Sequence, residues 1–279
     1  VTGVQTCALP ILKAMTNTTN STKLTNVKNI AASNSAVAAV NANFYFSTGN
    51  GNANALGPVI SDGKIVSMSH NFNANGSTMA TFSLDSFRMP SIDYWKTEMY
   101  IISPLNGASQ EITNYNRMSS YNFRDVIVLD RNYGKMFLGA SAQYPDLVEM
   151  VVENNIVKEI RIGQPPVEIP ENGYVAVSYA VKNNFIMDNF IVGYPCVIEV
   201  KCNIDWKKVD TAVSGSSVLL KDGVIPKEFS YASSDNNRRN PRTMVGFSKD
   251  GKTLYMVTVD GRQKESIGMT LKEAAQFMK

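Results

Sequence analysis

Histidine, cysteine and tryptophan are scarce in this chain of 279 residues, which holds one His, three Cys and two Trp. A single histidine, His70, excludes a metal site built from several imidazoles, and three cysteines are too few for a disulfide framework. No apolar run approaches the ~20 residues of a membrane-spanning helix. Basic residues number 27 against 24 acidic ones, a balance that does not indicate a nucleic-acid partner.

Motifs for the common cofactors are also lacking. The sequence holds no phosphate-binding P-loop, no glycine-rich dinucleotide fingerprint, no metalloprotease histidine pair and no nucleophile elbow. We therefore expect no metal and no cofactor. With 44% hydrophobic and 18% charged residues the chain is instead typical of a globular domain with a substantial core.

The two ends of the chain differ from the rest. Residues 1–11 (VTGVQTCALPI) resemble the translation of a sequencing-library adapter, so we expect them to lie outside the fold. At the other end, Thr270 and Glu273 have the spacing of a capping box, and an amphipathic helical pattern continues through Met278. Because no C-cap glycine follows this pattern, we expect residues 12–279 to form a single domain that is incomplete at both ends.

Hairpins are the dominant local signal. Asp-Gly and Asn-Asn pairs tolerate the positive φ angles of two-residue turns, and four such pairs lie between apolar segments. The expected hairpins pair 57–61 with 64–67, 148–152 with 156–162, 218–220 with 224–225, and 245–247 with 254–259. Further strands are expected at 36–40, 80–84, 99–102, 126–129, 174–179 and 196–202.

Helical periodicity is rare by comparison. It is clear at 24–33 and from Thr270, and a short helix is possible at 205–213. These patterns predict an α+β fold, a large and mostly antiparallel mixed sheet built from hairpins with a few flanking helices. Cys196 and Cys202 have the same parity on a predicted strand, so they lie too far apart to pair with each other.

The largest group of candidate functional residues lies on the last predicted hairpin. Asp260-Gly261-Arg262 ends one strand, and Arg242-Thr243 begins the other, eight or nine residues from the same turn. Arginine presents planar donors that match phosphate oxygens, and a carboxylate accepts a proton or orients a hydroxyl. The alternatives are a plain turn after a strand, a solvated basic loop, and a structural salt bridge between Arg242 and Asp260.

Two asparagines form a second candidate. Asn41 and Asn43 precede the aromatic segment Phe44-Tyr45-Phe46, and their amides can hydrogen-bond a sugar hydroxyl. The alternative is turn chemistry beside core aromatics. His70 lies alone in a polar stretch, and we assign it no role.

Taken in order, these motifs resemble the phosphodiester glycosidase family. The segments that carry the resemblance are 38–45, 57–64, 241–246, 259–262 and 268–271. The resemblance implies hydrolysis of a sugar-1-phosphodiester, such as an α-linked N-acetylglucosamine phosphodiester, in cell-surface or extracellular glycans. It implies catalytic roles for Asn41, Arg242, Asp260 and Arg262, and substrate contacts for Thr243 and Asn43.

The sequence departs from the family pattern at its end. The family's closing motif, an Asp followed by glycines and a Ser, is absent, so we expect this fragment to be inactive. Secretion or a cell-envelope location follows from the family alone. The alternative function is a non-catalytic glycan- or phosphate-binding module of a cell-envelope protein, and a third possibility is a β-rich structural domain without small ligands.

Overall fold

The computed structural model describes residues 12–17, 22–49, 51–69, 73–74, 77–118, 125–229 and 236–279. The helices are α1 (Val27–Ser33), α2 (Phe185–Asn189) and α3 (Leu271–Met278), with a short 3-10 helix η1 (Trp206–Lys208). The strands are β1 (Phe44–Gly49), β2 (Asn52–Leu56), β3 (Val59–Ser61), β4 (Lys64–Ser69), β5 (Asn73–Ala74), β6 (Ser77–Thr78), β7 (Ala80–Asp85), β8 (Pro90–Tyr94), β9 (Thr97–Ile102), β10 (Ser109–Tyr115), β11 (Val126–Leu129), β12 (Met136–Phe137), β13 (Leu147–Glu153), β14 (Ile156–Ile162), β15 (Val167–Glu168), β16 (Gly173–Tyr179), β17 (Val197–Cys202), β18 (Val209–Gly215), β19 (Arg242–Phe247) and β20 (Leu254–Val259).

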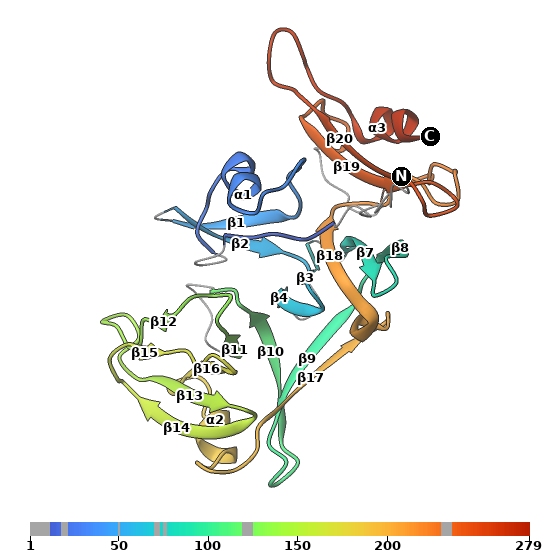
Figure 1. Cartoon of the computed structure of the whole chain (residues 1–279). Helices are drawn as coiled ribbons and strands as arrows, with labels where there is room; N and C mark the ends of the chain where they lie inside the picture. The colour runs from blue at the N-terminus through green and yellow to red at the C-terminus, as the bar shows by residue number, and fades with distance from the viewer. Residues whose placement is uncertain are drawn as a thin grey trace, which may run out of the picture.

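A 12-stranded sheet runs through the molecule in the order β14-β13-β16-β11-β10-β4-β3-β18-β7-β8, and β9 pairs with both β10 and β17. Every pairing in it is antiparallel except that of β10 with β11. The β11–β16 half lies below the β3, β7 and β18 half, and the long β9–β17 ribbon runs beside them (Figure 1). This is the α+β, mostly antiparallel mixed sheet that the sequence predicts.

Turn chemistry explains why the hairpins form where they do. Asp62 and Gly63 have φ angles of 49° and 71°, and Asn154 and Asn155 have 52° and 61°, as a two-residue turn with positive φ at both positions requires. The predicted β3–β4 and β13–β14 hairpins are therefore confirmed, as is β19–β20, whose strands are joined by residues 248–253.

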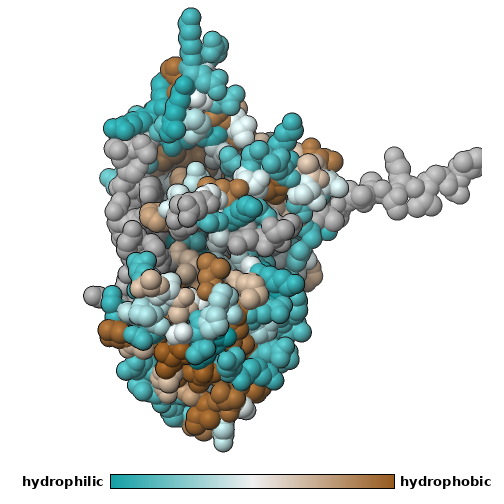
Figure 2. Space-filling model, turned by 90° about the vertical axis from the view of Figure 1, so that its left-hand side faces the viewer, coloured by the Kyte–Doolittle hydropathy of each residue, from teal (hydrophilic) through white to brown (hydrophobic). Residues whose placement is uncertain are grey.

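The lower half of the sheet has a core on each face. Met150 of β13 packs in one cluster with Ile186 of α2, whereas Val151 belongs to a second cluster with Phe137 and Ile169. A strand buried on both faces reads as a continuous apolar run, which is why β13 has six buried residues out of seven. On the face drawn in Figure 2, hydrophobic residues gather over this lower half while hydrophilic ones cover the upper tip.

A polar junction joins β4, β10 and β11. The Asn116 backbone N–H donates to the Val128 carbonyl at 2.8 Å, and its side-chain amide donates to the Val66 carbonyl at 2.9 Å and to the Asp130 carboxylate at 2.6 Å. The Asp130 backbone N–H returns a bond to Asn116 Oδ1 at 2.8 Å, and the Tyr115 hydroxyl donates to the same carboxylate at 3.0 Å. Asn116 adopts a left-handed φ of 55°, which asparagine tolerates better than most residues.

Three predicted elements are wrong. Residues 36–40 form no strand and are mostly exposed, because a run of small side chains buries too little area to hold a strand. Residues 205–213 are not one helix: only η1 is helical, and Val209 begins β18, where β-branched residues alternate along a sheet strand. Around Asp222 and Gly223 the turn forms, but only a single bridge between Lys221 and Val224 follows it.

The end helices agree with the sequence. α1 begins at Val27 with Asn26 as its side-chain N-cap, three residues later than the periodicity predicts. α3 has the predicted capping box of Thr270 and Glu273 and buries the predicted apolar face. Cys196 and Cys202 are both free thiols, as their spacing requires. His70 and residues 1–11 lie outside the described residues.

One ion pair between β13 and β14 is largely buried. Glu149 on β13 lies opposite Arg161 on β14, and the Arg161 Nε donates to Glu149 Oε2 at 3.0 Å. The Glu149 side chain is 0% exposed, and its Oε1 has no hydrogen-bond partner within the described residues. Burial raises the pKa of Glu149 to about 7, although the Arg161 guanidinium acts in the opposite direction.

The Asn116 junction predicts a large loss of stability when its amide is removed. Asn116→Gly keeps the positive φ but removes the partners of the Val66 carbonyl and of the Asp130 backbone N–H and one of the bonds to the Asp130 carboxylate, so we expect a loss of about 2–4 kcal/mol in the free energy of unfolding. Asn116→Ala adds the steric cost of a left-handed residue, about 1 kcal/mol more. Urea denaturation measures both, with Asn172→Ala, at an exposed turn, as the control. Equal values for Asn116→Gly and the control would contradict the role of the amide.

The Glu149 pair predicts an unusual pH dependence. Because the folded-state pKa of about 7 lies above the ordinary glutamate value of 4.5, the native state binds more protons than the unfolded state between these pH values. The contribution of Glu149 is therefore full below about pH 4.5 and is lost as pH rises through about 7, by roughly 1–3 kcal/mol. Thermal melts from pH 5 to 8 test this, and Glu149→Gln removes that part of the slope. A slope unchanged by Glu149→Gln would contradict it.

Candidate functional site

The predicted site residues at the end of the chain lie together at the base of the β19–β20 hairpin. In the ladder Arg242 is directly opposite Val259, so Asp260 is the next residue along, as the sequence predicts. Thr243 lies opposite Thr258 and is exposed. The hairpin pairs with no other strand among the described residues, and α3 packs on one of its faces at Gly246 through Met278.

The segment after β20 folds back onto the start of β19. Asn240 and Met269 form an isolated bridge with N···O distances of 3.2 and 3.0 Å. Gly268 has a φ of +85°, and a Cβ there would lie 2.4 Å from the Asn240 carbonyl oxygen. A Cβ at Gly261 would lie 2.7 Å from the Pro241 nitrogen. Glycine is therefore required at both positions by close backbone approach.

Arg262 carries backbone strain at the tip of this segment. Its φ is +58°, which is unusual for a residue without a short polar side chain and costs of order 1–3 kcal/mol. Its Nη2 donates to Asn240 Oδ1 at 3.1 Å, and the residue is exposed. Arg262 follows Asp260 in the chain with Gly261 between them, and its guanidinium is bonded to Asn240.

The other arginines of this region are engaged by the protein. Arg242 Nε donates to the Met269 carbonyl at 2.9 Å, and its Nη2 donates to the Arg238 carbonyl at 2.9 Å. Arg239 donates to the Gly268 carbonyl and forms an ion pair with Glu273. Arg242 thus positions the two segments that flank Arg262, while Arg239 fastens the start of α3.

The electrostatics at the start of α3 are set by the capping box. The Thr270 backbone N–H lowers the pKa of Glu273, with the Thr270 hydroxyl and the Arg239 guanidinium acting in the same direction. Glu273 is therefore an ionised structural carboxylate. Asp260 is exposed, and the Ser266 hydroxyl donates to its backbone carbonyl rather than to its carboxylate.

The two predicted asparagines lie in another part of the fold. Asn43 lies between β2 and β18: its side-chain NH₂ donates to the Leu56 carbonyl at 2.7 Å, and its Oδ1 accepts from the Ser214 N–H at 3.1 Å. With its amide used in this way, Asn43 holds two strands together. Asn41 is exposed. No hydrogen bond or ion pair within the described ranges joins either asparagine to the hairpin base.

The sequence did not single out the Asp130 cluster. Burial raises the pKa of Asp130, although hydrogen bonds from Asn132, Asn116 and Tyr115 oppose this shift. Burial also raises the pKa of Tyr115 well above its ordinary value. The signal in the sequence is a polar Asp-Arg-Asn triplet directly after the buried strand β11, but its partners are distant along the chain.

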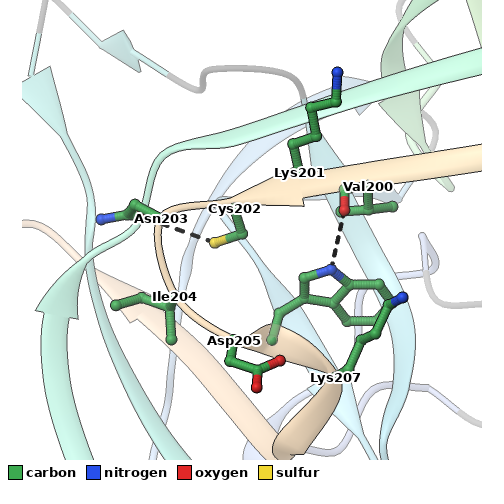
Figure 3. Close-up of a pocket in the computed structure, with 8 residues that line it drawn as sticks. Val200, Lys201, Cys202, Asn203, Ile204, Asp205 and Lys207 are labelled. Carbon is green, nitrogen blue, oxygen red and sulfur yellow. Dashed lines mark hydrogen bonds between the residues drawn. The ribbon is translucent and has the colours of Figure 1, made fainter.

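A hollow of about 500 Å³ lies at the bend between β17 and β18, and none of the predicted site residues lines it. The Trp206 indole N–H donates to the Val200 carbonyl at 3.2 Å, and the Cys202 sulfur lies 3.6 Å from Asn203 Oδ1 (Figure 3). Burial raises the pKa of the Cys202 thiol, so it is not an activated nucleophile.

Within the described ranges, His, Cys, Asp and Glu side chains form no group of three or more suited to a metal ion. No helix there is both long and apolar enough to cross a membrane.

The fold and the hairpin base define an α+β domain that carries a strained arginine beside a carboxylate. The family model for phosphodiester glycosidases matches residues 146–279, which confirms the predicted resemblance. The matched segment holds Arg242, Thr243, Asp260 and Arg262 and leaves Asn41 and Asn43 outside it. The roles of all six residues remain predictions.

Solved structures share the fold. A hypothetical protein from Synechocystis has a TM-score of 0.70 at 18% identity over 93% of this chain. A candidate exported protein from Burkholderia pseudomallei K96243 has a TM-score of 0.71 at 18% identity over 92% of this chain. This chain spans 46% and 61% of those two chains, respectively. No curated protein matches the chain.

The close approach at Gly268 predicts that a single methyl group opens the hairpin base. Gly268→Ala forces a Cβ against the Asn240 carbonyl at a positive φ, so we expect a loss of about 1–3 kcal/mol and rapid amide exchange at Asn240 and Met269. Hydrogen exchange read by NMR measures this. Gly193→Ala is the matched control, because its φ of +88° is also positive and nothing lies within 4 Å of a Cβ there. Unchanged protection of both amides in Gly268→Ala would show that the bridge does not close this loop.

Proposed function

We propose that this domain binds and hydrolyses a sugar-1-phosphodiester, such as an α-linked N-acetylglucosamine phosphodiester. The observation that carries the proposal is the exposed Arg262, two residues after Asp260 at the end of β20, which is held at a φ of +58° and bonded to Asn240. Strain of this kind persists where the surrounding structure enforces it, and it gathers at functional sites. The match to the phosphodiester glycosidase family over this segment supports the same chemistry.

The residues suit the charges of this reaction. Hydrolysis adds water to C1 of the sugar and breaks the bond between C1 and the bridging oxygen, which leaves with the phosphate. That phosphate carries negative charge, so a guanidinium that neutralises it assists departure. Arg262 would hold the phosphate, and Asp260 would orient water or stabilise positive charge at C1. Arg242, whose donors meet backbone carbonyls, would act as a positioning residue.

We further propose that these 279 residues alone bind this substrate without turning it over. Cleavage of glycosidic bonds normally uses two carboxyl groups. Glu273 is committed to the capping box and to Arg239, and no hydrogen bond or ion pair in the described part of the chain holds a second carboxylate against Asp260. The same observation favours a glycan- or phosphate-binding module as the second candidate function. Export to the cell surface, where such glycans lie, is part of the proposal and rests on the family resemblance.

The test uses the methyl phosphodiester of N-acetylglucosamine. We expect the chain to bind it without releasing free sugar. Arg262→Gln should weaken binding by at least about tenfold, because it removes the charge that faces the phosphate. Lys264→Gln, an exposed charge in the same loop, is the matched control and should change binding by less than about threefold. Calorimetry measures affinity and a free-sugar assay measures turnover.

Each outcome has a distinct meaning. Turnover by the unaltered chain would overturn the proposed inactivity, and Asp260→Asn should then lower kcat by about 100-fold or more. If Arg262→Gln and Lys264→Gln weaken binding equally, the ligand is held by nonspecific attraction to positive charge and not by a specific contact with Arg262. Neither binding nor turnover would overturn the proposed function.

A further inference from the structure

A small groove lies beside β1, away from the hairpin base. Its volume is about 160 Å³, and its lining comes from the N-terminal segments 15–17 and 22–25, from α1, and from β1 and β2. Figure 1 shows α1 next to the β1–β2 pair. None of the residues of the hairpin base lines this groove.

The groove exists because small side chains face a large one. In the β1–β2 ladder Tyr45 lies opposite Ala55 and Ser47 opposite Ala53, so all four residues lie on the same face. Ala53 is 5% exposed and forms part of the floor. The two alanines leave a hollow beside the Tyr45 ring. Asn43 fixes this geometry by joining β2 to β18.

The lining combines apolar and polar residues. The Tyr45 ring is 62% exposed, and Leu24 and Ile30 provide aliphatic walls. Thr16 and Thr25 place hydroxyl groups at the same groove. Lys23 is the one charged residue among those that line it.

This combination fits one class of ligand. A cationic ligand would find no compensating charge in this lining, an anionic one would find only Lys23, and a peptide or acyl chain would need a longer apolar channel. A single pyranose ring has apolar C–H faces that pack on an aromatic ring, and hydroxyl groups around its edge that hydrogen-bond to polar side chains. The size of the groove, smaller than a site for a drug-sized molecule, suits one ring.

We propose that this groove is a second, non-catalytic glycan subsite that holds one neutral pyranose against Tyr45. The choice of an N-acetylglucosamine probe rests on the proposed function, whereas the groove and its chemistry do not. The subsite would hold a neighbouring sugar of a glycan while another part of the chain binds the phosphodiester.

The test is saturation-transfer difference NMR of the full chain with methyl α-N-acetylglucosaminide. This probe carries no phosphate, so it does not report on Arg262. We expect binding in the millimolar range, with the strongest transfer to ring C–H protons. Tyr45→Ala removes the stacking surface and should abolish the signal. Ala55→Leu fills the floor and should do the same by a different route.

The controls separate the groove from the fold and from the hairpin base. Phe87→Ala removes another exposed aromatic ring, 85% exposed at the β7–β8 turn, and should leave the signal unchanged. Asp260→Asn and Arg262→Gln should also leave it unchanged. Thermal melts identify a variant that has unfolded. If Ala55→Leu unfolds, Tyr45→Ala still tests the proposal, because it changes an exposed residue.

Three outcomes would overturn the subsite. The first is no transfer in the unaltered chain, and the second is transfer that persists in a folded Tyr45→Ala variant. The third is transfer lost in Asp260→Asn but retained in Tyr45→Ala, which would assign the sugar to the hairpin base. Failure of the phosphodiester to bind, with this signal intact, would overturn the proposed function alone.

Discussion

The join between β4 and β10, made beside the parallel β10–β11 pair, is the constraint on which the rest of the sheet depends. The upper and lower halves of the sheet meet where β4 pairs with β10, and that ladder has only two residue pairs. The Asn116 amide extends the join by a bond to the Val66 carbonyl, while its backbone N–H meets Val128 of β11. One side chain therefore replaces the ladder bonds that a longer strand would provide. The left-handed backbone of Asn116 turns the chain away from β10. The Asp130 carboxylate accepts a bond from the Asn116 amide and fixes its orientation.

How well the sequence predicts each feature of the fold depends on how far apart along the chain the residues that determine it lie. Hairpins such as β13–β14 follow from two turn residues and their neighbours, because positive φ is a local requirement. The capping box of α3 is local in the same way. Residues 36–40 fail because a short apolar run becomes a strand only where a partner binds it, and partner choice is a property of the whole sheet. The junction of Val66, Asn116 and Asp130 joins residues up to 64 positions apart, and no short pattern predicts it.

The same distinction between local and long-range features applies to the candidate site. The approach of Arg242 to Asp260 follows from counting residues to a shared turn, and the ladder register agrees with it. The hydrogen bonds from the Arg242 guanidinium to backbone carbonyls could not be predicted by counting residues. One of the acceptors is Met269, which lies beyond the hairpin in the chain and folds back onto it. By resemblance to the family, the sequence predicted catalytic roles for both Arg242 and Arg262. In the structure the Arg242 and Arg239 side chains bond backbone carbonyls of the surrounding segments, whereas Arg262 lies exposed and bonds Asn240.

The different roles of these arginines have a chemical explanation. A phosphate leaving group is a weak base, so its departure needs charge neutralisation more than it needs a proton. An ordinary sugar alcohol is a much stronger base and needs a general acid. A site that offers an exposed guanidinium beside one carboxylate is matched to the first kind of substrate and poorly matched to the second. Under the proposed function, selectivity for phosphate-linked sugars would then arise from the catalytic groups themselves. The backbone strain at Arg262 would be the cost of holding that charge where the bond breaks.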